Sequence, residues 1–265
     1  MKVANRRDAI FQAVQEGVSD VTALCRKFGI SEATARRDLH ALQQAGRLLR
    51  VYGGAVATPI LHEPEESLES RQSQHHDAKA AIARMGAAML AEGDTVFIDG
   101  GTTTQSLARE IPQGLAIRIF TNNLLAVQTL AERGIPVSLV GGDLRPGSMS
   151  VFGVLADLAL ERLTFDKVYT SADGVDVELG LCEGSIEQAW FKDKVFRRAR
   201  EIIVLATSEK LGRRSQMYWS PINRAWTLIT DSHAQAHQLQ PFASHAFVEV
   251  HQALAPTHDL SLIHI

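Results

Sequence analysis

The chain of 265 residues has only two cysteines, Cys25 and Cys182, which lie far apart and outside any metal-ligand spacing. They are expected to be reduced thiols, so neither a disulfide nor a cysteine-based metal centre is predicted. Long apolar runs are also missing, since no stretch approaches about 18 consecutive apolar residues. The N-terminus lacks the apolar core of a signal peptide. The sequence therefore predicts a cytosolic protein without membrane association.

Charge of one sign does not dominate the chain, whose formal net charge is -3. It is unevenly distributed, however, because residues 1–58 carry a net charge of +4 and the remainder carries -7. A small cationic part joined to a larger acidic one favours contact with a polyanion through the first part only. The length and the 45% hydrophobic content predict one small and one large domain with a sizeable core.

The spacing of apolar residues predicts three helices in the cationic part. The first spans residues 5–16, and the second spans residues 21–29 and ends in a tight turn at Gly29. Ser31 is a suitable N-cap for the third helix, because its hydroxyl can accept a backbone hydrogen bond. Two helices joined by a short turn with glycine are typical of a helix-turn-helix, whose second helix enters the DNA major groove.

The third helix has one apolar face, with Ala35, Leu39 and Leu42, and one polar and basic face. The run "RLLRVYGGA" then predicts a wing-like hairpin that reaches phosphates or the minor groove. For an isolated arginine pair, a solvated charged helix would be the better interpretation. The succession of turn, cap, cationic face and wing favours DNA binding instead. The residues predicted to meet double-stranded DNA are Ser31, Ala33, Thr34, Arg36, Arg37, His40, Arg50 and Tyr52.

Residues 58–76 are rich in Pro, Ser, Glu and Gln and show little periodicity. They predict a linker between a DNA-binding domain at residues 1–57 and a second domain at residues 77–259. The last six residues, 260–265, read "LSLIHI", which is the in-frame translation of a common sequencing adapter. We expect this tail to be non-native and leave it out of the fold.

Beyond residue 77, short β-rich runs alternate with helical patterns. This alternation predicts a doubly wound α/β domain, in which helices cover both faces of a mainly parallel sheet. Ligands of such sheets bind at the carboxyl ends of the strands. The polar residues at these ends predict an effector site made by Asp99, Gly101, Thr102, Thr103, Thr104, Thr121, Asn122, Asn123, Asp173, Gly174 and Lys210.

The Gly-Thr loop before a helix suits an anion such as phosphate, and Lys210 could supply the countercharge. Asp99, Asn122 and Asp173 could hold the hydroxyls of a sugar or polyol. For any single loop, an ordinary turn is at least as good an interpretation. Five polar strand ends together favour a pocket for a polar ligand.

The stretch "SEATARRDLHALQQAGRLLRVYGGA" resembles the N-terminal signature of the DeoR family of bacterial transcriptional regulators. The blocks "DGGTTTQSLA", "TNNLLAVQTL", "GGDLRPGSMSVFG", "SADGVDVELGLCEGS" and "VLATSEKLG" resemble successive blocks of the family's C-terminal domain. The resemblance covers about residues 5–231 and implies a sugar-phosphate sensor on a fold shared with ribose-5-phosphate isomerase. The chain departs from the family pattern at Thr207, where an aspartate is usual, and in the strand before Asp173, which is usually more apolar.

The resemblance and the residues together predict an effector-responsive transcription factor. We expect a repressor of a sugar or sugar-acid operon, relieved by a phosphorylated sugar, sugar acid or polyol. One DNA-binding unit makes too few contacts for operon-level specificity, so a homo-oligomer is implied.

Two other functions compete with this interpretation. A sugar-phosphate isomerase could use Asp173 or Asp176 as a general base, but it would not need the recognition helix and wing. A module whose α/β domain only oligomerises would leave the polar strand ends unexplained. No cofactor is predicted, because "GGDLRPG" lacks the spacing of a phosphate-binding P-loop. No metal is predicted either, because His233 and His237 lack a third ligand nearby.

Overall fold

The computed structural model describes residues 3–15, 18, 20–44, 48–51, 54–57 and 65–254. Tyr52, residues 58–64 of the expected linker and the tail 260–265 lie outside the described residues. The chain divides into two compact units, Met1–Leu61 and His62–Ile265, which are taken in turn below. In the described part of the chain, no helix has the length and apolar character that crossing a membrane requires.

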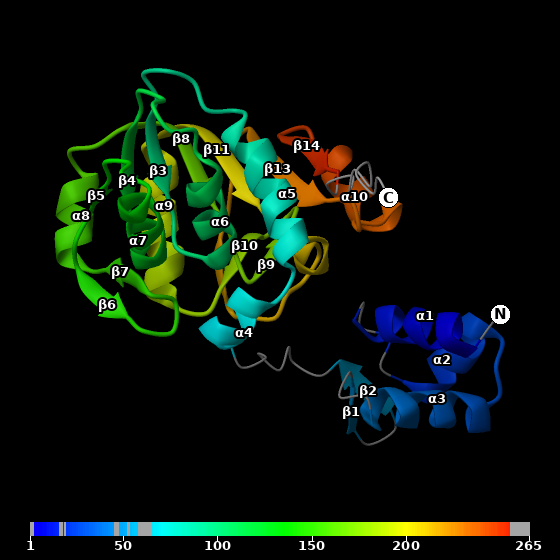
Figure 1. The fold of residues 1–265 in the computed structure, drawn as a ribbon. Coiled ribbons are helices and arrows are strands. Elements are labelled where there is room, and N and C mark those ends of the chain that lie inside the picture. The colour runs from blue at the N-terminus through cyan, green and yellow to red at the C-terminus, as the bar shows by residue number, and fades with distance from the viewer. Residues whose placement is uncertain are drawn as a thin grey trace, which may run out of the picture. The chain divides into compact units, whose positions relative to one another are not determined.

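The first unit contains three helices followed by an antiparallel hairpin, as predicted (Figure 1). The helices are α1 (Val3–Gln15), α2 (Val21–Phe28) and α3 (Glu32–Gln44), and the strands are β1 (Leu48–Val51) and β2 (Gly54–Ala57). The expected apolar face of α3 is buried and packs against α1 and α2, in a core of Ile10, Ala13, Val14, Val21, Leu24, Ala35, Leu39 and Leu42. The helix-turn-helix and wing predicted from the sequence are therefore confirmed.

Local hydrogen bonds define the turn between α2 and α3. Gly29 ends α2 in the left-handed region, with φ at 62°, a conformation that glycine adopts without steric cost. The Ser31 hydroxyl accepts a hydrogen bond from the Thr34 amide at 3.3 Å, so Ser31 caps α3 as predicted. The turn and the cap together fix where α3 begins, and hence which of its residues face outward.

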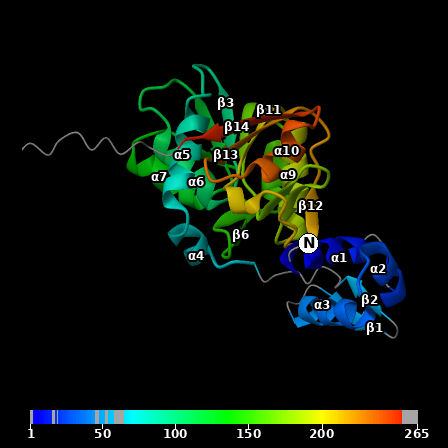
Figure 2. The ribbon, with the colours of Figure 1, turned by 90° about the vertical axis from the view of Figure 1, so that its right-hand side faces the viewer.

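A seven-stranded parallel sheet forms the centre of the second unit. Its strands are β3 (Thr95–Ile98), β4 (Arg118–Thr121), β5 (Ser138–Leu139), β8 (Phe165–Thr170), β11 (Ala199–Leu205), β13 (Trp226–Asp231) and β14 (Val248–Ala253). They lie in the order β14-β13-β11-β8-β3-β4-β5. Helices α5 (His76–Ala87), α6 (Thr102–Glu110) and α7 (Leu124–Glu132) cover one face, and α8 (Val154–Leu160), α9 (Ile186–Arg197) and α10 (Ala236–Ala243) cover the other (Figures 1 and 2). The predicted doubly wound α/β domain is confirmed.

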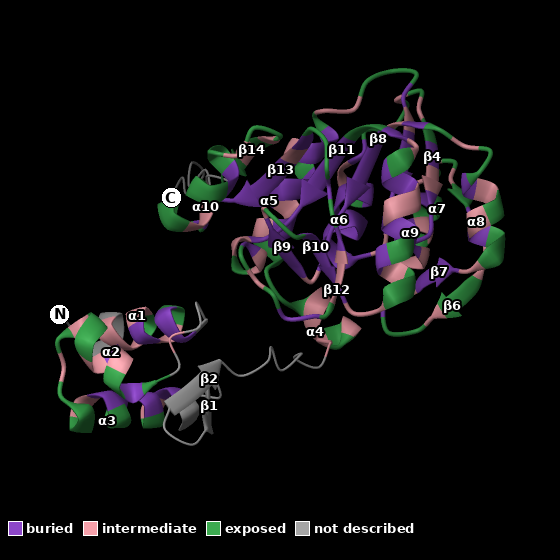
Figure 3. Cartoon of the chain, turned by 180° about the vertical axis from the view of Figure 1, so that it is seen from behind, coloured by how far each residue is buried: buried purple, intermediate pink, exposed green. Residues whose placement is uncertain are grey.

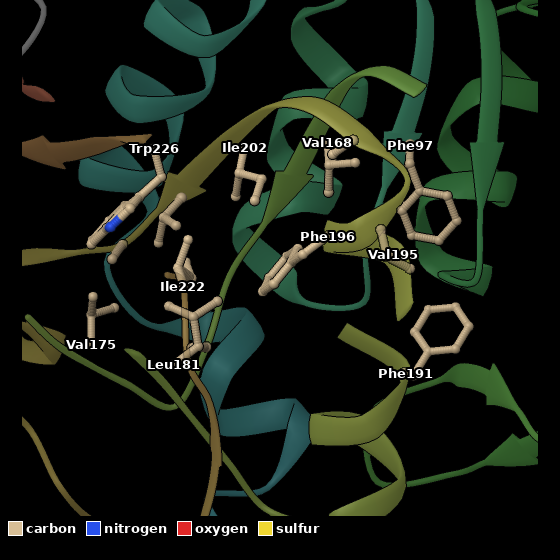
Figure 4. Close-up of a cluster of buried hydrophobic side chains, with 14 of the residues drawn as sticks. Phe97, Val168, Val175, Leu181, Phe191, Val195, Phe196, Ile202, Ile222 and Trp226 are labelled. Carbon is tan, nitrogen blue, oxygen red and sulfur yellow. The ribbon is translucent and has the colours of Figure 1, made fainter. Parts of the chain in front are cut away.

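Alternate residues of each central strand enter opposite cores. Val96 and Ile98 of β3 pack with α5, α6 and α7, whereas Phe97 between them packs with α8 and α9. Figure 4 shows Phe97 close to Phe191 of α9, with ring centroids 5.9 Å apart. Because both faces are covered, the central strands β3, β8, β11 and β13 are mostly buried (Figure 3), whereas the edge strands β5 and β14 are largely exposed or half-buried.

Antiparallel pieces that the sequence did not predict surround the carboxyl edge of the sheet. They are the hairpin of β6 (Asp143–Arg145) with β7 (Ser150–Phe152), and a three-stranded sheet of β9 (Gly174–Asp176), β10 (Gly180–Glu183) and β12 (Tyr218–Ser220). A short 3-10 helix, η1 (Ser208–Lys210), follows β11. These pieces supply walls to the site described below.

The second half of the expected linker differs from the expectation, because residues 65–76 belong to the second unit. They contain helix α4 (Leu68–Ser73), which Ser67 caps by accepting a hydrogen bond from the Ser70 amide at 3.2 Å. Helix α4 has six residues and none of them is buried. A helix this short and polar leaves no hydrophobic period in the sequence, which explains why it was missed.

Candidate functional site

The strand order creates a crevice between β3 and β8. From β3 the chain winds outward through β4 and β5, and it then returns to β8 on the other side of β3. The loops that follow these two strands are adjacent, since the Asp99 amide donates to the Tyr169 carbonyl at 2.9 Å. Such a reversal of strand order is where doubly wound sheets bind ligands.

A small polar pocket lies at this point. It is lined by the loops after β3 and β8, by the antiparallel pieces and by helix α4, through Arg71, Gly100, Gly101, Thr102, Ser148, Ser171, Ala172, Asp173, Glu183, Gln188 and Lys210. Four residues of the predicted effector site are among them: Gly101, Thr102, Asp173 and Lys210. The structure therefore brings part of the predicted site together at the predicted edge.

Helix α6 begins at this pocket, with Thr102 as its first residue. Its N-cap, Gly101, makes no side-chain cap hydrogen bond, so the first amides of α6 have neither a cap nor an intrahelical acceptor. Gly101 has φ at 136°, and an added Cβ would lie 2.2 Å from the Ser171 hydroxyl oxygen, so only glycine fits here. The positive end of the helix dipole therefore faces the pocket across bare backbone.

Lys210 reaches the same pocket from the end of η1, and its ammonium group donates to the Ala172 carbonyl at 2.7 Å. Burial lowers the pKa of Lys210, and the nearby carboxylates of Asp173 and Glu209 oppose that change. A partly buried cation that donates to a neutral carbonyl can still take an anion as partner.

The other predicted effector residues do not line the pocket, namely Asp99, Thr103, Thr104, Thr121, Asn122, Asn123 and Gly174. Several of them hold the loop in shape instead. Asn123 caps α7 through its carbonyl oxygen and donates from its amide nitrogen to the Gly101 carbonyl at 3.0 Å. Thr104 donates to the same carbonyl at 2.9 Å, and Thr121 donates to the Ile98 carbonyl. Short polar side chains after a strand thus satisfy backbone groups here, which the sequence pattern does not distinguish from ligand contacts.

Asp99 lies beneath the pocket in an ion network that the sequence reasoning missed. Lys192 of α9 is 4% exposed, and its ammonium group pairs with Asp99, donates to Ser171 and Thr170, and lies 3.3 Å from a Glu183 carboxyl oxygen. Burial alone would lower the pKa of Lys192, but the charges of Asp99 and Glu183 outweigh it and raise the pKa. Asp99 is therefore a structural partner of Lys192.

The sequence did carry a signal for Lys192. On a helix, residues three and four apart share a face. Lys192 is three residues from Ala189 and Val195 and four from Phe196, all of which are buried. A lysine on the apolar face of a helix indicates a buried cation with a partner elsewhere in the fold.

A second cluster of charges borders the pocket at its mouth. Glu65 accepts hydrogen bonds from Arg145 of β6, at 3.1 Å for one of the two, and from Arg71 of α4 at 3.3 Å. Arg71 also donates to the Gly147 carbonyl at 2.6 Å. The hydrogen bond with Glu65, strengthened by its charge, raises the pKa of Arg145. No local pattern reveals this cluster, because Glu65 and Arg145 are 80 residues apart in the sequence.

Several buried polar atoms around the pocket make no hydrogen bond within the described residues. They include the Ser148 hydroxyl and the Gln188 carbonyl oxygen, which belong to lining residues, and both polar atoms of the Asn122 amide. Native proteins satisfy nearly all buried polar groups. Unpaired polar atoms that surround one pocket therefore favour a polar ligand there.

Helix α3 of the first unit presents the predicted DNA-binding face. Ser31, Ala33, Arg36, Arg37 and His40 are exposed, and Thr34 is half-buried. Arg36 pairs with Glu32 at 2.7 Å, while Arg37 donates to the Ala33 carbonyl of its own helix at 3.3 Å. Arg50 lies in β1, but its side chain and all of Tyr52 are outside the described residues.

Asp38, the residue after Arg37, lies on the buried side of α3, and its role was not predicted. It is buried and accepts hydrogen bonds from Arg6 at 2.7 Å and Arg7 at 3.0 Å, both on α1. Burial alone would raise the pKa of Asp38, but the two guanidinium groups outweigh it and lower the pKa. Asp38 therefore binds α3 to α1 through two ion pairs, and Arg36 and Arg37 face outward.

Comparison with known proteins agrees with this division. Residues 6–59 match the DeoR-like helix-turn-helix domain, and residues 74–232 match the DeoR C terminal sensor domain. The HTH-type transcriptional regulator GlpR of Haloferax volcanii is 32% identical over 245 residues, which cover 92% of this chain and 96% of that protein. The chain belongs to the DeoR family. The resemblance predicted from the sequence motifs is confirmed.

Other matches of this DeoR-family chain differ in strength. The lactose phosphotransferase system repressor of Streptococcus mutans is 31% identical, over 87% of this chain and 93% of that protein. Among solved structures, ribose 5-phosphate isomerase A of Methanocaldococcus jannaschii is 17% identical with a TM-score of 0.38, and the match covers 50% of this chain and 52% of that one. The likeness to the isomerase is too distant to bear on function.

Proposed function

We propose that this DeoR-family regulator represses an operon of sugar or sugar-acid metabolism and leaves its DNA when it binds a phosphorylated sugar, sugar acid or polyol. One observation carries the proposal. A polar pocket, with a bare helix N-terminus, Lys210 and Arg71 around it, is built into the same chain as an outward-facing basic recognition helix. The name of the Streptococcus mutans relative, a lactose phosphotransferase system repressor, supports the class of operon.

The pocket suggests how the effector would sit. A phosphate group would accept hydrogen bonds from the first amides of α6 and pair with Lys210. Asp173, Gln188 and Ser148 would then orient hydroxyl groups on the rest of the ligand. Burial raises the pKa of Glu183 to about 8, and the nearby charge of Lys192 opposes that change.

On the DNA side, α3 would enter the major groove with Arg37 at the centre of its exposed face. Ser31, Ala33, Thr34, Arg36 and His40 would contact base edges or phosphates around it, and Arg50 and Tyr52 would extend the contact from the hairpin. Because each chain offers one such helix, we expect it to bind repeated half-sites as a homo-oligomer.

The environment of Asp176, one of the two carboxylates that an isomerase could use as a general base, disfavours an isomerase activity. Asp176 accepts a hydrogen bond from Arg214 at 2.6 Å and two more from the amides of Glu178 and Leu179. Burial alone would raise the pKa of Asp176, but these hydrogen bonds outweigh it and lower the pKa. A carboxylate stabilised in this way is a poor general base at neutral pH.

The test uses the full chain. Duplexes that it binds are first selected from a random pool, and a thermal-shift screen of sugar phosphates, phosphorylated sugar acids and polyol phosphates then finds its effector. The effector is expected to weaken binding to the selected duplex about 5 to 150-fold, the usual range of coupling between two sites.

Lys210→Met should abolish the response to effector and leave DNA affinity in its absence nearly unchanged. Lys194→Met is the control, because Lys194 pairs with Asp157 on the exposed side of α9, away from the residues that line the pocket. A Lys210→Met protein that still responds would place phosphate recognition elsewhere. Turnover of the effector by the wild-type protein would favour the isomerase instead.

A further inference from the structure

Arg71 and Arg145 direct their guanidinium groups at one carboxylate, that of Glu65, at the mouth of the pocket. Their side chains are 10% and 26% exposed, and that of Glu65 is 19% exposed. Glu65 also lies beside the lining residue Asp173, since a Cβ on Gly184 would be 3.0 Å from a Glu65 oxygen and 3.5 Å from an Asp173 oxygen. Arginine binds carboxylate and phosphate with the same forked geometry. Glu65 therefore occupies a position that these two arginines could offer to an external anion.

The pocket beside this cluster is narrow. The space at its centre is about 20 Å³, which is room for about one water molecule. Arg71 forms part of the wall. A ligand larger than water therefore requires part of the wall to move.

The segment that carries Glu65 and Arg71 is held by polar contacts. Arg71 donates to the carbonyls of Gly147 and Glu66, and Lys79 donates to the carbonyls of Arg71 and Gln74. Helix α4 buries no residue. Polar contacts of this kind can be exchanged for contacts with an anion, whereas a segment held by apolar burial would have to expose that surface to water.

We propose that Glu65 is an internal competitor of the anionic effector, and that its displacement is the switch that links the pocket to the DNA-binding unit. This inference rests on the proposed function. With Glu65 bound to the two arginines, Arg71 stays in the wall of the pocket. When an anion takes the place of Glu65, Arg71 and Arg145 keep a countercharge, and the Glu65 carboxylate moves into water. No buried charge is left unpaired in either state, so the two states can be close in free energy.

The position of Glu65 in the chain gives the displacement its effect. The first unit ends at Leu61, four residues before Glu65. Release of residues 65–74 would lengthen the connection between the DNA-binding unit and α5, which begins at His76. The effective concentration of a tethered binding module depends on the length of its connection. Effector binding would thereby change how two DNA-binding units in an oligomer engage one duplex.

The first experiment needs no ligand and compares Glu65→Gln with Glu66→Gln in the full chain. Both variants remove one negative charge, but the Glu66 carboxylate contacts the Ser70 hydroxyl at 2.5 Å rather than an arginine. Amide hydrogen exchange over residues 65–75 should be faster in Glu65→Gln and unchanged in Glu66→Gln. Glu65→Asp, which keeps the charge on a shorter side chain, should fall between Glu65→Gln and the wild type. Equal exchange in Glu65→Gln and the wild type overturns the inference.

The second experiment measures binding of inorganic phosphate, and of the effector found by the screen, by calorimetry. If Glu65 holds the site nine-tenths of the time, it reduces the apparent affinity about tenfold, so Glu65→Gln should bind about tenfold more tightly than the wild type. Phosphate should also accelerate exchange over residues 65–75 in the wild-type protein. Equal affinity in the two proteins overturns the inference alone and leaves the proposed function intact. Binding of no anion to any of these proteins overturns both.

Discussion

The two units place their functional cations in opposite ways. On α3, Arg36 and Arg37 are exposed and come from one short stretch of sequence. In the second unit, Lys192 is buried and Arg71 is largely so; Asp99 and Glu183, from the loop after β3 and from β10, hold Lys192, and Glu65 holds Arg71. A surface that meets DNA needs cations that are hydrated and free to contact phosphates and bases. A pocket for a small anion needs cations held in fixed positions, and carboxylates hold them there.

The first unit also contains a buried charged residue. Like the buried cations of the second unit, it is held in place by oppositely charged side chains. Asp38 lies next to Arg37 in sequence, but it is buried and pairs with two arginines of α1. Burial, rather than residue type, therefore separates the charges that hold the fold together from those available to a partner. The following predictions test this separation, from the largest expected effect to the smallest.

Lys192→Met should have the largest effect, because it leaves Asp99 buried without its cation. Removing one partner of a buried pair costs about 3–5 kcal/mol of unfolding free energy. Lys194→Met, two residues further along α9, should cost less than about 1 kcal/mol, since Lys194 and Asp157 are an exposed pair. Denaturant unfolding followed by tryptophan fluorescence measures this unit alone, because Trp190, Trp219 and Trp226 all lie within it. Equal destabilisation by the two variants would contradict the structural role of Lys192.

Arg37→Ala should remove most of the discrimination between a selected duplex and a random one. A side chain that reads a base contributes about 1–3 kcal/mol to that difference. Arg36→Ala should have a smaller effect, because the Arg36 guanidinium is already paired with Glu32. Fluorescence anisotropy titrations at one salt concentration measure both. If Arg37→Ala lowers the affinity for both duplexes by the same factor, Arg37 contacts phosphate rather than bases.

Glu183→Gln should change how stability depends on pH. In the folded protein the pKa of Glu183 is about 8, against an ordinary value of 4.5, so the folded state keeps a proton that the unfolded state has released. The contribution of Glu183 to the free energy of unfolding therefore falls as the pH rises from about 4.5 to 8, by at most about 1.4 kcal/mol per pH unit. Glutamine does not titrate, so the Tm of Glu183→Gln minus the Tm of the wild type should increase as the pH rises from 5 to 8. Parallel Tm curves would show that Glu183 is ionised throughout.

Arg50→Ala should have the smallest effect and should not depend on DNA sequence. We expect Arg50, on strand β1 of the hairpin, to contact phosphate, so its loss should weaken selected and random duplexes alike. The slope of log affinity against log salt should become shallower by roughly one unit. Titrations at several salt concentrations measure this slope. A change in discrimination without a change in slope would assign Arg50 to base contact instead.

Residues close in sequence were predicted well. The spacing of Ala35, Leu39 and Leu42 correctly gave the buried face of α3, Ser31 gave its start, and Gly29 gave the end of α2. In the second unit, the alternation of strands and helices correctly gave the doubly wound sheet and the edge at which its pocket lies. Each of these features depends on a helical or strand period, or on a local backbone hydrogen bond, and so can be recognised within a few residues.

The sequence by itself thus determined the family, the two kinds of domain and the exposed basic face of α3. Only the tertiary structure decided which polar residues line the pocket. Asn123 and Thr104 follow strands as Gly101 and Asp173 do, yet they satisfy backbone groups inside the loop. Glu65, Arg71 and Arg145 come together only because a segment read as linker packs on the sheet edge. A charged side chain has no periodic pattern that names its partner, since an ion pair depends on distance in space and not on separation along the chain.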